Sequence, residues 1–446
     1  MYFKNQKFCV FGLSSSGRCA AEKLLSLGAT VYIYDEDGSP RITKTAEDLS
    51  KKGPLIGTSE IGEVFGIVDV IVLSPGVRID HPLLVQAKRN KKRIIGELEL
   101  GSYFMKAPMV AVTGTNGKTT TCTLVFEALK AAGVESAALG NYGVPLTING
   151  EKLSSNGVAV VEVSSFQLET VRSFCPHIAV ILNVTSDHLD RHYTRENYVY
   201  LKSRLLTNLR ESEYAVLNFD DTTVRSFGAG LKTNVIWFSE TEKVSGAYVK
   251  EGYFYWFDER LFSVDTLPLK GEHNVENALA AICVLKTLNI DNEVIARSFS
   301  EFKGVKHRIE LVLSKNGVDY YNDSKSTNVS STIVAIDAMK KPTVLILGGK
   351  DKDQDYAPLF EKIKHSLVRH AVLTGEERYK LLAAANAAGF IGVTVSPGFE
   401  SAVKIAKIEA RGEGAVLLSP ATSSFDAFSN YEERGEEFAR IVREIS

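Results

Sequence analysis

A chain of 446 residues is long enough for about two to four domains, and 44% hydrophobic and 24% charged residues are ordinary for a protein with several buried cores. A net charge of −2 gives no general attraction to nucleic acid or to an anionic membrane, so neither is an expected partner. Five scattered cysteines without a CxxC pair argue against a disulfide framework or a zinc site. No run approaches the ~18 apolar residues of a membrane span and no signal-peptide pattern opens the chain, so we expect a cytoplasmic protein.

The first hundred residues follow the outline of half a Rossmann fold. A strand over Lys7–Phe11 enters the glycine turn Gly12–Gly17 and a helix, and a second strand, Thr30–Tyr34, ends at the acid Asp35. The central glycine of a dinucleotide fingerprint is Ser14 here. Serine hydroxyls beside backbone N–H groups suit a diphosphate, with NAD as the weaker alternative.

A third strand over Val68–Leu73 ends in the turn Ser74–Gly76. This turn falls at the carboxyl edge of the sheet, where open α/β sheets bind ligands, although the segment by itself favours a simple turn. The basic run KRNKKR at 88–93 is typical of a solvated helix end and not of a nucleic-acid patch.

The stretch PMVAVTGTNGKTTTCTL at 108–124 predicts a phosphate-binding loop. An apolar strand, Met109–Thr113, enters a glycine turn that opens a helix, and the backbone N–H groups of such a turn hold phosphate oxygens. Lys118 can place its charge on the outer phosphates, and Thr119 supplies a hydroxyl at the Mg²⁺-ligand position of a P-loop. The general pattern has glycine where this chain has Val112, so the match is not strict. We expect an ATP or GTP site here.

Two further apolar runs deliver polar residues to the same edge of this central sheet. The run VAVVEV contains Glu162, which needs a cation or a hydrogen-bond donor because an unpaired buried carboxylate is costly. The run that begins at Ile178 is followed by His188, with Asp187 and Asp190 beside it. A structural role is the alternative for His188 alone, but the neighbouring acids favour a metal or catalytic role.

Lys202 lies on the predicted helix YVYLKSR, where the residues alone favour a surface lysine. Residues 214–270 are typical of strands and loops whose aromatic side chains serve packing, and a helix begins in GEHNVENALA at 271–280.

From about residue 305 onward, a hairpin precedes alternating strands and helices, which predicts a second open α/β sheet. We expect its strands at 343–347, 371–373 and 415–418. Two strand ends carry Lys350 with Lys352 and the hydroxyl-rich segment Ser419–Asp426, which suits a small anionic substrate. An exposed charged loop is the alternative for the two lysines.

Taken together, these segments resemble the Mur ligase family of peptidoglycan synthesis over essentially the whole chain. TGTNGKTT is similar to the family's ATP loop, which accounts for Val112, and EVSSFQLE, NVTSDHLDRH, GEHNVENALAA, HRIE and LSPATSSFDAF follow in the family order. SSFQLE and NDSKSTN resemble the member that adds D-glutamate to UDP-N-acetylmuramoyl-L-alanine, whereas GLSSSG departs from the glycine-richer form common in the family.

The resemblance implies an α/β fold of three domains. A Rossmann-like domain at 1–103 would bind the UDP-linked substrate, a P-loop-type ATPase domain at 104–304 would bind ATP, and a Rossmann-like domain at 305–446 would bind the amino acid and part of ATP.

The implied enzyme is an ATP-dependent acid–amino-acid ligase. ATP phosphorylates the terminal alanine carboxylate, the amine of D-glutamate attacks the acyl phosphate, and ADP and phosphate are released. The product would serve peptidoglycan and cell wall biogenesis, and with it cell shape, cell division and the cell cycle. We expect a monomer that uses ATP and two Mg²⁺ ions. Another Mur-type ligase, a folylpolyglutamate-synthetase-like ligase and a nucleotide-binding sensor without turnover are the alternatives.

The resemblance also implies roles for individual residues. The catalytic residues would be Lys118, His188 and Lys202. The ATP-binding residues would be Gly114, Thr115, Asn116, Gly117, Lys118, Thr119, Thr120, Asn277, Arg308 and Asp323. The metal ligands would be Thr119, Glu162, His188 and Lys202, the last as a carbamate. The substrate-binding residues would be Ser14, Ser15, Ser16, Asp35, Ser74 and Gly76 for the uridine diphosphate, Asn141 for the muramoyl-alanine part, Lys325 at the reaction centre or the phosphates, and Thr327, Lys352, Ser424 and Tyr431 for D-glutamate.

Overall fold

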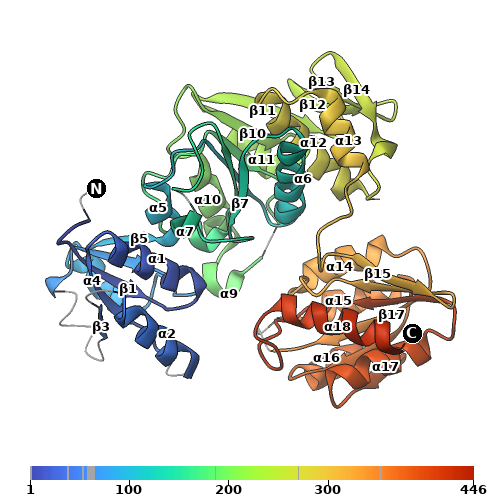
Figure 1. The fold of residues 1–446 in the computed structure, drawn as a ribbon. Helices are drawn as coiled ribbons and strands as arrows, with labels where there is room; N and C mark the ends of the chain where they lie inside the picture. The colour runs from blue at the N-terminus through green and yellow to red at the C-terminus, as the bar shows by residue number, and fades with distance from the viewer. Residues whose placement is uncertain are drawn as a thin grey trace. The chain divides into compact units, whose positions relative to one another are not determined.

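The structure is a computed structural model that describes residues 3–37, 40–52, 55–57, 66–149, 151–185, 187–269, 271–350 and 354–445. Three sheets follow one another along these residues, each flanked by helices, which confirms the predicted α/β fold class (Figure 1). The chain forms two compact units, one of Met1–Pro268 with Glu272–Phe302 and one of Leu269–Gly271 with Lys303–Ser446. The domain boundaries near residues 103 and 304 stay predictions.

The first sheet is parallel, with strand order β3-β2-β1-β4-β5. Its strands are β1 (Lys7–Phe11), β2 (Thr30–Tyr34), β3 (Leu55–Gly57), β4 (Val70–Leu73) and β5 (Arg93–Gly96), and its helices are α1 (Ser15–Ser26), α2 (Pro40–Ser50), α4 (Pro82–Arg89) and α5 (Glu97–Ser102). The strand order reverses between β1 and β4. Ligands of open α/β sheets bind outside the carboxyl ends of the strands at such a point.

The glycine turn after β1 allows α1 to approach the sheet closely. Gly12 has φ +88°, a backbone conformation that favours glycine. A Cβ atom on Gly17 would lie 1.8 Å from the carbonyl oxygen of Gly12. Only glycine at position 17 therefore permits this packing, although the middle position of the fingerprint is Ser14.

The second sheet has nine strands in the order β14-β13-β12-β11-β10-β9-β6-β8-β7, and its pairs are parallel except that β13 is antiparallel to both its neighbours, β12 and β14. The strands are β6 (Met109–Thr113), β7 (Ser136–Gly140), β8 (Val158–Glu162), β9 (Ile178–Ile181), β10 (Tyr214–Asn218), β11 (Asn234–Ser239), β12 (Gly246–Lys250), β13 (Tyr253–Trp256) and β14 (Glu259–Ser263). The helices are α6 (Lys118–Ala131), α7 (Leu146–Asn149), α8 (Ser165–Leu168), α9 (Leu189–His192), α10 (Arg195–Ser203), α11 (Thr222–Phe227), α12 (Glu272–Thr287) and α13 (Asn292–Ser300), with 3₁₀ turns at Arg204–Leu206 and Val264–Thr266.

Strand β6, which lies between β9 and β8, is buried along its whole length, as its continuous apolar run predicts. Its side chains alternate between the two faces of the sheet, and Ala111 packs in a core cluster with Tyr198 and Leu205. Helices α6 and α12 pack against each other and against strands of this sheet (Figure 1). The phosphate-binding loop therefore follows a buried interior strand of the sheet.

The third sheet, in the second unit, has the order β15-β16-β20-β17-β18-β19, with only the β15–β16 pair antiparallel. The strands are β15 (Glu310–Lys315), β16 (Val318–Asn322), β17 (Thr343–Gly348), β18 (Val368–Thr374), β19 (Val393–Val395) and β20 (Gly414–Leu418), and the helices are α14 (Val329–Ala338), α15 (Ala357–Lys364), α16 (Arg378–Ala387), α17 (Phe399–Glu409) and α18 (Tyr431–Ile445). Two apolar clusters cover the two faces. The predicted hairpin and the three predicted strands are confirmed.

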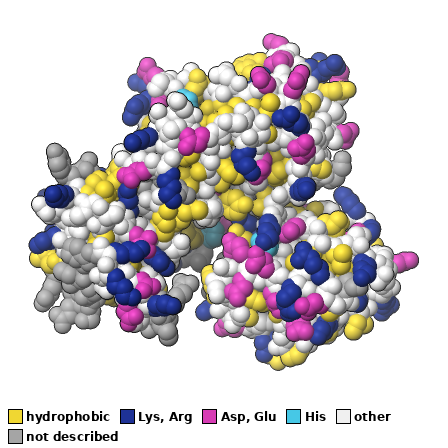
Figure 2. Space-filling model, viewed as in Figure 1, with side chains coloured by type: hydrophobic (Ala, Val, Ile, Leu, Met, Phe, Trp, Pro, Cys, Tyr) yellow, Lys and Arg dark blue, Asp and Glu magenta, His cyan; other side chains and the backbone are white. Residues whose placement is uncertain are grey.

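Basic and acidic side chains are interspersed over the face shown in Figure 2, in keeping with the small net charge. All five cysteines are unpaired thiols, as their scattered spacing predicts. Within the described part of the chain, no helix combines the length and the apolar character that crossing a membrane requires.

Candidate active site

The phosphate-binding loop lies between β6 and α6, where the sequence predicts it. Gly117 precedes α6 with φ +84°, and a Cβ atom there would lie 2.1 Å from Oδ1 of Asn277. The backbone N–H of Thr115 donates to the carbonyl of Asn183, and the N–H of Asn116 donates to Oδ1 of the same residue, both at 2.9 Å. The loop is thus held by the residues that follow β9.

The side chain of Lys118 folds back over this loop. Its Nζ donates to the carbonyl oxygens of Gly114 at 2.9 Å and Thr115 at 2.7 Å. Gly117 offers no side chain to cap α6, so N–H groups of the first helical turn are available to an anion. Phosphate oxygens would offer both the ammonium and these N–H groups stronger acceptors than neutral carbonyls.

The carboxylate of Glu162 is buried at the end of β8 beside the loop. Its Oε2 accepts a hydrogen bond from the hydroxyl of Thr119 at 2.7 Å, and its Oε1 accepts one from the amide of Asn141 at 2.6 Å. The predicted need for a partner is confirmed. We call these three residues the Glu162 cluster.

Hydroxyl and carboxylate oxygens in the Glu162 cluster are ligands that Mg²⁺ prefers, so these residues fit the expected metal. Across the described ranges, no group of three or more His, Cys, Asp or Glu side chains is close enough to hold a metal ion. A magnesium site here would therefore draw on the Thr119 hydroxyl, on phosphate oxygens and on water as well as on carboxylate.

Lys202 is buried, so the surface position that the residues alone favour is wrong. Helix α10 turns Tyr198, Leu201 and Lys202 inward together. Nζ donates to the hydroxyl of Thr113 at 3.1 Å and to the carbonyl of Gly114 at 2.8 Å. Burial, assisted by the nearby charge of Lys118, holds the pKa of Lys202 well below its ordinary value, which favours the neutral amine.

His188 lies just after the carboxyl edge of β9 in a left-handed conformation, with φ +52°. Its Nε2 is 3.5 Å from Oδ2 of Asp187, and its ring meets that of Phe166 edge-on with centroids 4.9 Å apart. The side chain of Asp190 lies outside the described residues. The neighbouring His192 is buried and shares a hydrogen bond of 2.9 Å with the hydroxyl of Ser165.

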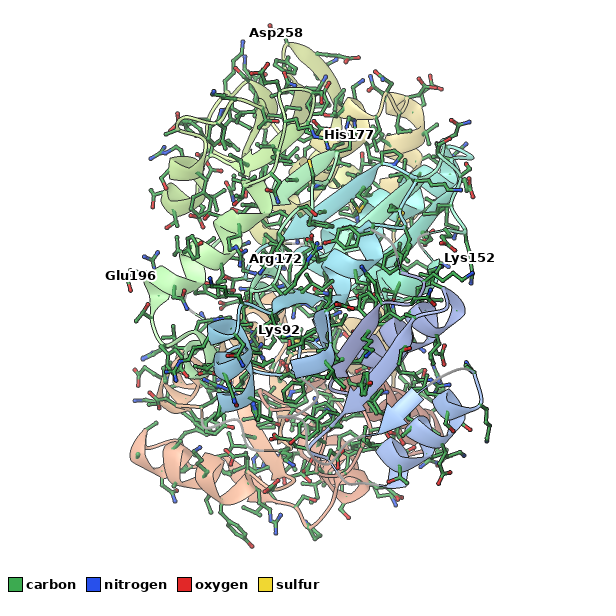
Figure 3. The ribbon with its side chains drawn as sticks, turned by 90° about the vertical axis from the view of Figure 1, so that its left-hand side faces the viewer. Lys92, Lys152, Arg172, His177, Glu196 and Asp258 are labelled. Carbon is green, nitrogen blue, oxygen red and sulfur yellow. The ribbon has the colours of Figure 1, made fainter. Side chains whose placement is uncertain are left out.

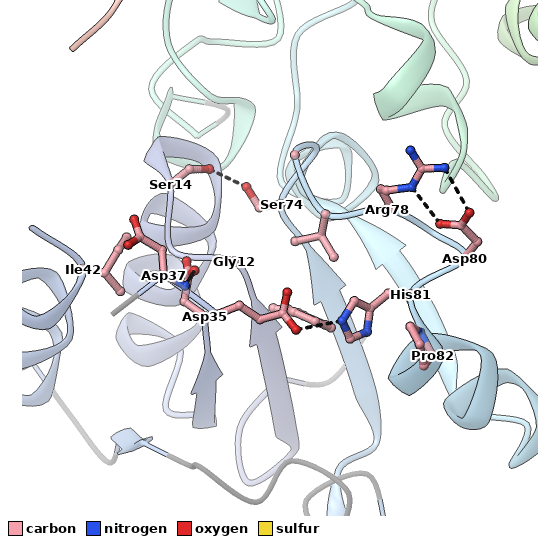
Figure 4. Close-up of a pocket in the computed structure, with 14 residues that line it drawn as sticks. Gly12, Ser14, Asp35, Asp37, Ile42, Ser74, Arg78, Asp80, His81 and Pro82 are labelled. Atoms are coloured by element: carbon pink, nitrogen blue, oxygen red, sulfur yellow. Dashed lines mark hydrogen bonds and ion pairs between the residues drawn. The ribbon is translucent and has the colours of Figure 1, made fainter. Parts of the chain in front are cut away.

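A cavity of about 610 Å³ opens at the carboxyl edge of the first sheet (Figure 4). Four predicted residues line it, namely Ser14, Asp35, Ser74 and Gly76. The hydroxyls of Ser14 and Ser74 are 2.5 Å apart, and Oδ2 of Asp35 accepts the N–H of Leu13 at 2.6 Å. Ser15 and Ser16 begin α1 and are not among the lining side chains.

Several charged residues that line this cavity were not among those predicted from the sequence. Glu36 pairs with His81 at 2.9 Å, and Nε of Arg78 lies 3.1 Å from Asp80 (Figure 4). The signals available were the acidic pair after β2 and the charged segment VRIDH after the turn Ser74–Gly76.

In the second unit, the predicted ATP residues Arg308 and Asp323 are neighbours. Asp323 is buried, and its oxygens accept the hydroxyl of Ser419 at 2.7 Å and the N–H of Ile309 at 3.2 Å. Burial raises the pKa of Asp323, which the charge of Arg308 opposes. Nη1 of Arg308 donates to the hydroxyl of Ser326 at 3.0 Å.

Among the residues predicted to hold D-glutamate, Tyr431 contacts Lys325. Nζ of Lys325 lies 3.4 Å from the phenol oxygen and 5.2 Å from the ring centroid. Ser424 is buried and Thr327 is half-buried. Lys352 lies outside the described residues.

Arg434 is a residue that the sequence offered no signal to find. It is fully buried, and its guanidinium donates to the hydroxyl of Ser324 at 3.0 Å and to the carbonyls of Thr422 and Ser423, both at 3.1 Å. It therefore joins the NDSKSTN segment to the LSPATSSF segment.

Comparison with known families agrees with this arrangement. Residues 6–96 match the Mur ligase MurD-like N-terminal domain, residues 112–285 the Mur ligase middle domain, and residues 307–422 the Mur ligase glutamate ligase domain. The chain belongs to the Mur ligase family, which confirms the resemblance seen in its motifs.

Individual relatives of the chain point to one member of this family. The chain is 40% identical over 450 residues to the UDP-N-acetylmuramoylalanine–D-glutamate ligase of Caldanaerobacter subterraneus subsp. tengcongensis, with all of both chains covered. It is 39% identical over 452 residues to the enzyme of the same name from Koribacter versatilis, covering 100% of this chain and 99% of the relative.

Two solved structures share the fold. UDP-N-acetylmuramate-alanine ligase MurC from Thermotoga maritima has a TM-score of 0.60 at 18% identity and covers 99% of this chain and 100% of its own. MurF ligase from the same organism, in complex with ADP, has a TM-score of 0.60 at 17% identity and covers 99% and 96%.

Proposed function

We propose that this Mur ligase joins D-glutamate to UDP-N-acetylmuramoyl-L-alanine at the expense of ATP, as a step in peptidoglycan precursor synthesis. The observation that carries the proposal is the end-to-end match, at 39–40% identity, to relatives named for this reaction. The phosphate-binding loop and the Glu162 cluster supply the chemistry that such a ligase needs. Because ATP and nucleotide-linked precursors are cytoplasmic compounds, the reaction belongs in the cytoplasm.

The first step brings a carboxylate to a triphosphate, and both are anions. Two unit charges 4 Å apart repel by roughly 4 kcal/mol at an effective dielectric constant of about 20. Lys118, which now donates to two loop carbonyls, can turn to the outer phosphates and offset part of this repulsion. The alanine carboxylate then attacks the γ-phosphorus, the bond to ADP breaks, and an acyl phosphate forms.

The residues that would hold Mg²⁺ are Thr119, Glu162, His188 and Lys202. Bound Mg²⁺ would supply further positive charge on the phosphate oxygens. As an ammonium, Lys202 would repel a nearby Mg²⁺. Its burial favours the amine, which can react with CO₂ to give an anionic carbamate with loss of one proton.

The second step forms the amide. The amine of D-glutamate attacks the acyl carbon, phosphate leaves, and the amine gives up a proton. Thr327, Lys352, Ser424 and Tyr431 carry one ammonium and three hydroxyls, which suits the two carboxylates of D-glutamate. The first-sheet cavity would hold the uridine diphosphate, while Arg308, Asp323 and Asn277 would contact ATP.

An amino-acid panel tests this proposal. We expect the purified protein to release ADP with UDP-N-acetylmuramoyl-L-alanine only when D-glutamate is added, and to release little with L-glutamate, L-lysine or a diamino acid. ADP release with another acceptor and amino acid, but not with this pair, would point to a different Mur-type or folylpolyglutamate-type ligase. Binding of ATP without turnover of any pair would support the sensor alternative.

A further inference from the structure

Arg191, on α9, forms a buried ion pair that the reaction scheme does not use. Its Nε and Nη2 donate to the two carboxylate oxygens of Glu169 at 2.9 and 2.6 Å, and its side chain is only 8% exposed. The guanidinium also lies over the ring of Phe166, 4.2 Å from the centroid. Such a two-pronged, stacked arrangement fixes the position of the guanidinium.

The same guanidinium also donates to the turn that lines the cavity of the first sheet. Nη1 donates to the carbonyl of Gly76 at 3.3 Å, and Nη2 donates to the carbonyl of Val77 at 2.9 Å. Both of these residues line the cavity. Two residues on, the phenol of Tyr193 bonds to Arg78 and Asp80, which also line it. A short segment after His188 therefore holds the turn that forms one wall of the cavity.

The same segment is also connected to the phosphate-binding loop through side-chain contacts. Oε1 of Glu169 lies 3.5 Å from Nδ1 of His192. The ring centroid of His192 lies 5.5 Å from that of Tyr198. The phenol of Tyr198 bonds to the hydroxyl of Thr115 in the loop at 3.1 Å. Phe166, under the Arg191 guanidinium, also packs against His188. The contacts are continuous from the cavity wall to the loop.

We propose that Arg191 is a positioning residue that sets the first-sheet cavity in register with the phosphate-binding loop. The inference rests on the proposed function, in which the cavity holds one end of a long substrate and the loop faces its carboxylate at the other. An error of about 1 Å in such an alignment costs on the order of 10²-fold in rate. Lysine cannot replace Arg191, because a single ammonium group cannot donate to both oxygens of a carboxylate and also reach two carbonyls.

The test uses Arg191→Ala and Arg191→Lys in the full chain. We expect kcat for D-glutamate-dependent ADP release to fall on the order of 10²-fold in both variants. The Kd of ATP and the Kd of UDP, each measured alone, should stay close to those of the unsubstituted protein, because the turn keeps its own backbone hydrogen bonds, from Ser74 to Phe11 and from Val77 to Ser74, and the variant changes only its alignment with the loop. Added guanidinium ion should restore part of the kcat of Arg191→Ala, whereas ammonium should not.

Arg172→Ala is the matched control. Arg172 also donates from its guanidinium to a first-sheet carbonyl, that of Ile94 at 3.2 Å, and lies above Lys92 in Figure 3. It takes no part in the contacts that lead to the loop. A purely structural role for Arg191 predicts that the two Ala variants lose thermal stability alike and keep kcat; the positioning role predicts that only Arg191→Ala loses kcat.

Unchanged kcat in both Arg191 variants, or an equal loss in Arg172→Ala, would overturn the inference. If Arg191→Ala does not fold, Arg191→Lys decides, since it retains a cation at the site. Absence of D-glutamate-dependent turnover in the unsubstituted protein would instead contradict the proposed function, and the variants would then be compared with the amino acid that does support ADP release.

Discussion

Burying the amine of Lys202 beside the phosphate-binding loop lowers the stability of the fold, whereas the proposed function gives this lysine a role in the reaction. Lys202 donates to Thr113 and Gly114, and neither acceptor carries a full charge to compensate the ammonium. Burial of an amine at such a place, assisted by the charge of Lys118, lowers the pKa of Lys202 well below its ordinary value and so favours the neutral form. The proposed function gives Lys202 a use as a carbamate ligand, which its contribution to folding does not supply.

Lys202→Met should abolish ligase activity and yet raise the free energy of unfolding by about 1 kcal/mol, because an apolar side chain of similar length removes the cost of burying the amine. The carbonyl of Gly114 keeps its hydrogen bond from Lys118 in the variant. Thermal melting and the ADP-release assay measure the two effects. Full activity in Lys202→Met would remove Lys202 from the catalytic residues.

The shorter variant, Lys202→Ala, gives a second readout of the same role. Small carboxylates should restore part of its activity by occupying the space of the carbamate, and bicarbonate should leave the variant unaffected. In the unsubstituted protein, the carbamate should be detectable as ¹³CO₂ incorporated at Lys202 by NMR.

At the scale of an element, two glycines with different surroundings flank α6, Gly117 just before it and Gly133 two residues after its end. Gly117 and Gly133 both have positive φ, +84° and +72°. A Cβ atom on Gly117 would collide with Asn277, whereas a Cβ atom on Gly133 would meet nothing within 4 Å. Alanine substitutions at the two positions therefore distinguish the effect of backbone strain from the effect of displacing Asn277.

Gly117→Ala should weaken ATP binding by at least about tenfold, which corresponds to ~1.4 kcal/mol, because Asn277 must move and the loop with it. Gly133→Ala should lower stability by about 1 kcal/mol through left-handed strain alone and leave the Kd of ATP unchanged. Calorimetric titration with ATP distinguishes them. Equal affinities in the two variants would show that the contact between the loop and Asn277 is not needed for nucleotide binding.

At the scale of the whole first unit, helix α5 carries two buried carboxyl groups whose pKa values are shifted in opposite directions. Glu99 accepts the backbone N–H groups of Arg172 at 2.9 Å and Phe174 at 3.0 Å, which belong to the segment before β9. Burial acts to raise the pKa of Glu99, but these N–H groups and nearby hydroxyls outweigh it and lower the pKa. Burial raises the pKa of Glu97, although Thr147 donates two hydrogen bonds to it.

Glu99→Gln should therefore destabilise the protein at pH 7 by about 2 kcal/mol, since an amide cannot replace a carboxylate that accepts several N–H bonds. Because the folded pKa of Glu99 is lowered, its contribution is present above the ordinary value of 4.5 and is lost as pH falls through the folded pKa. The unfolding free energy of the variant should accordingly depend less on pH in that acidic range, as urea titrations would measure.

Glu97→Gln, on the same helix, is the control with the opposite sign. A raised folded pKa means that ionisation costs stability as pH rises above 4.5 towards the folded pKa. The variant should be as stable as the unsubstituted protein at pH 7, or more so. A loss of stability in Glu97→Gln as large as that in Glu99→Gln would contradict this assignment of the two carboxyl groups.

Much of the fold and part of the site could be predicted from local patterns. The strands Lys7–Phe11, Thr30–Tyr34 and Met109–Thr113 were predicted at their observed ends, because apolar β-branched runs that stop at glycine turns are local signals. The need of Glu162 for a partner followed from the cost of burying a charge. Lys202 could not be placed in this way, since nothing near it in the chain shows that α10 turns it inward.

Local patterns in the chain were enough to predict the α/β class, the phosphate-binding loop and, through its motifs, the family, because each depends on residues close together in the chain. Tertiary structure alone decided which distant groups meet. The pairing of Glu162 with Thr119 and Asn141, the burial of Lys202 and Arg434, and the hydrogen bond of Arg191 to Gly76 all depend on segments separated by many residues. Such contacts depend on strand order and helix packing. These involve several segments at once, so they cannot be recognised in the sequence of any one segment.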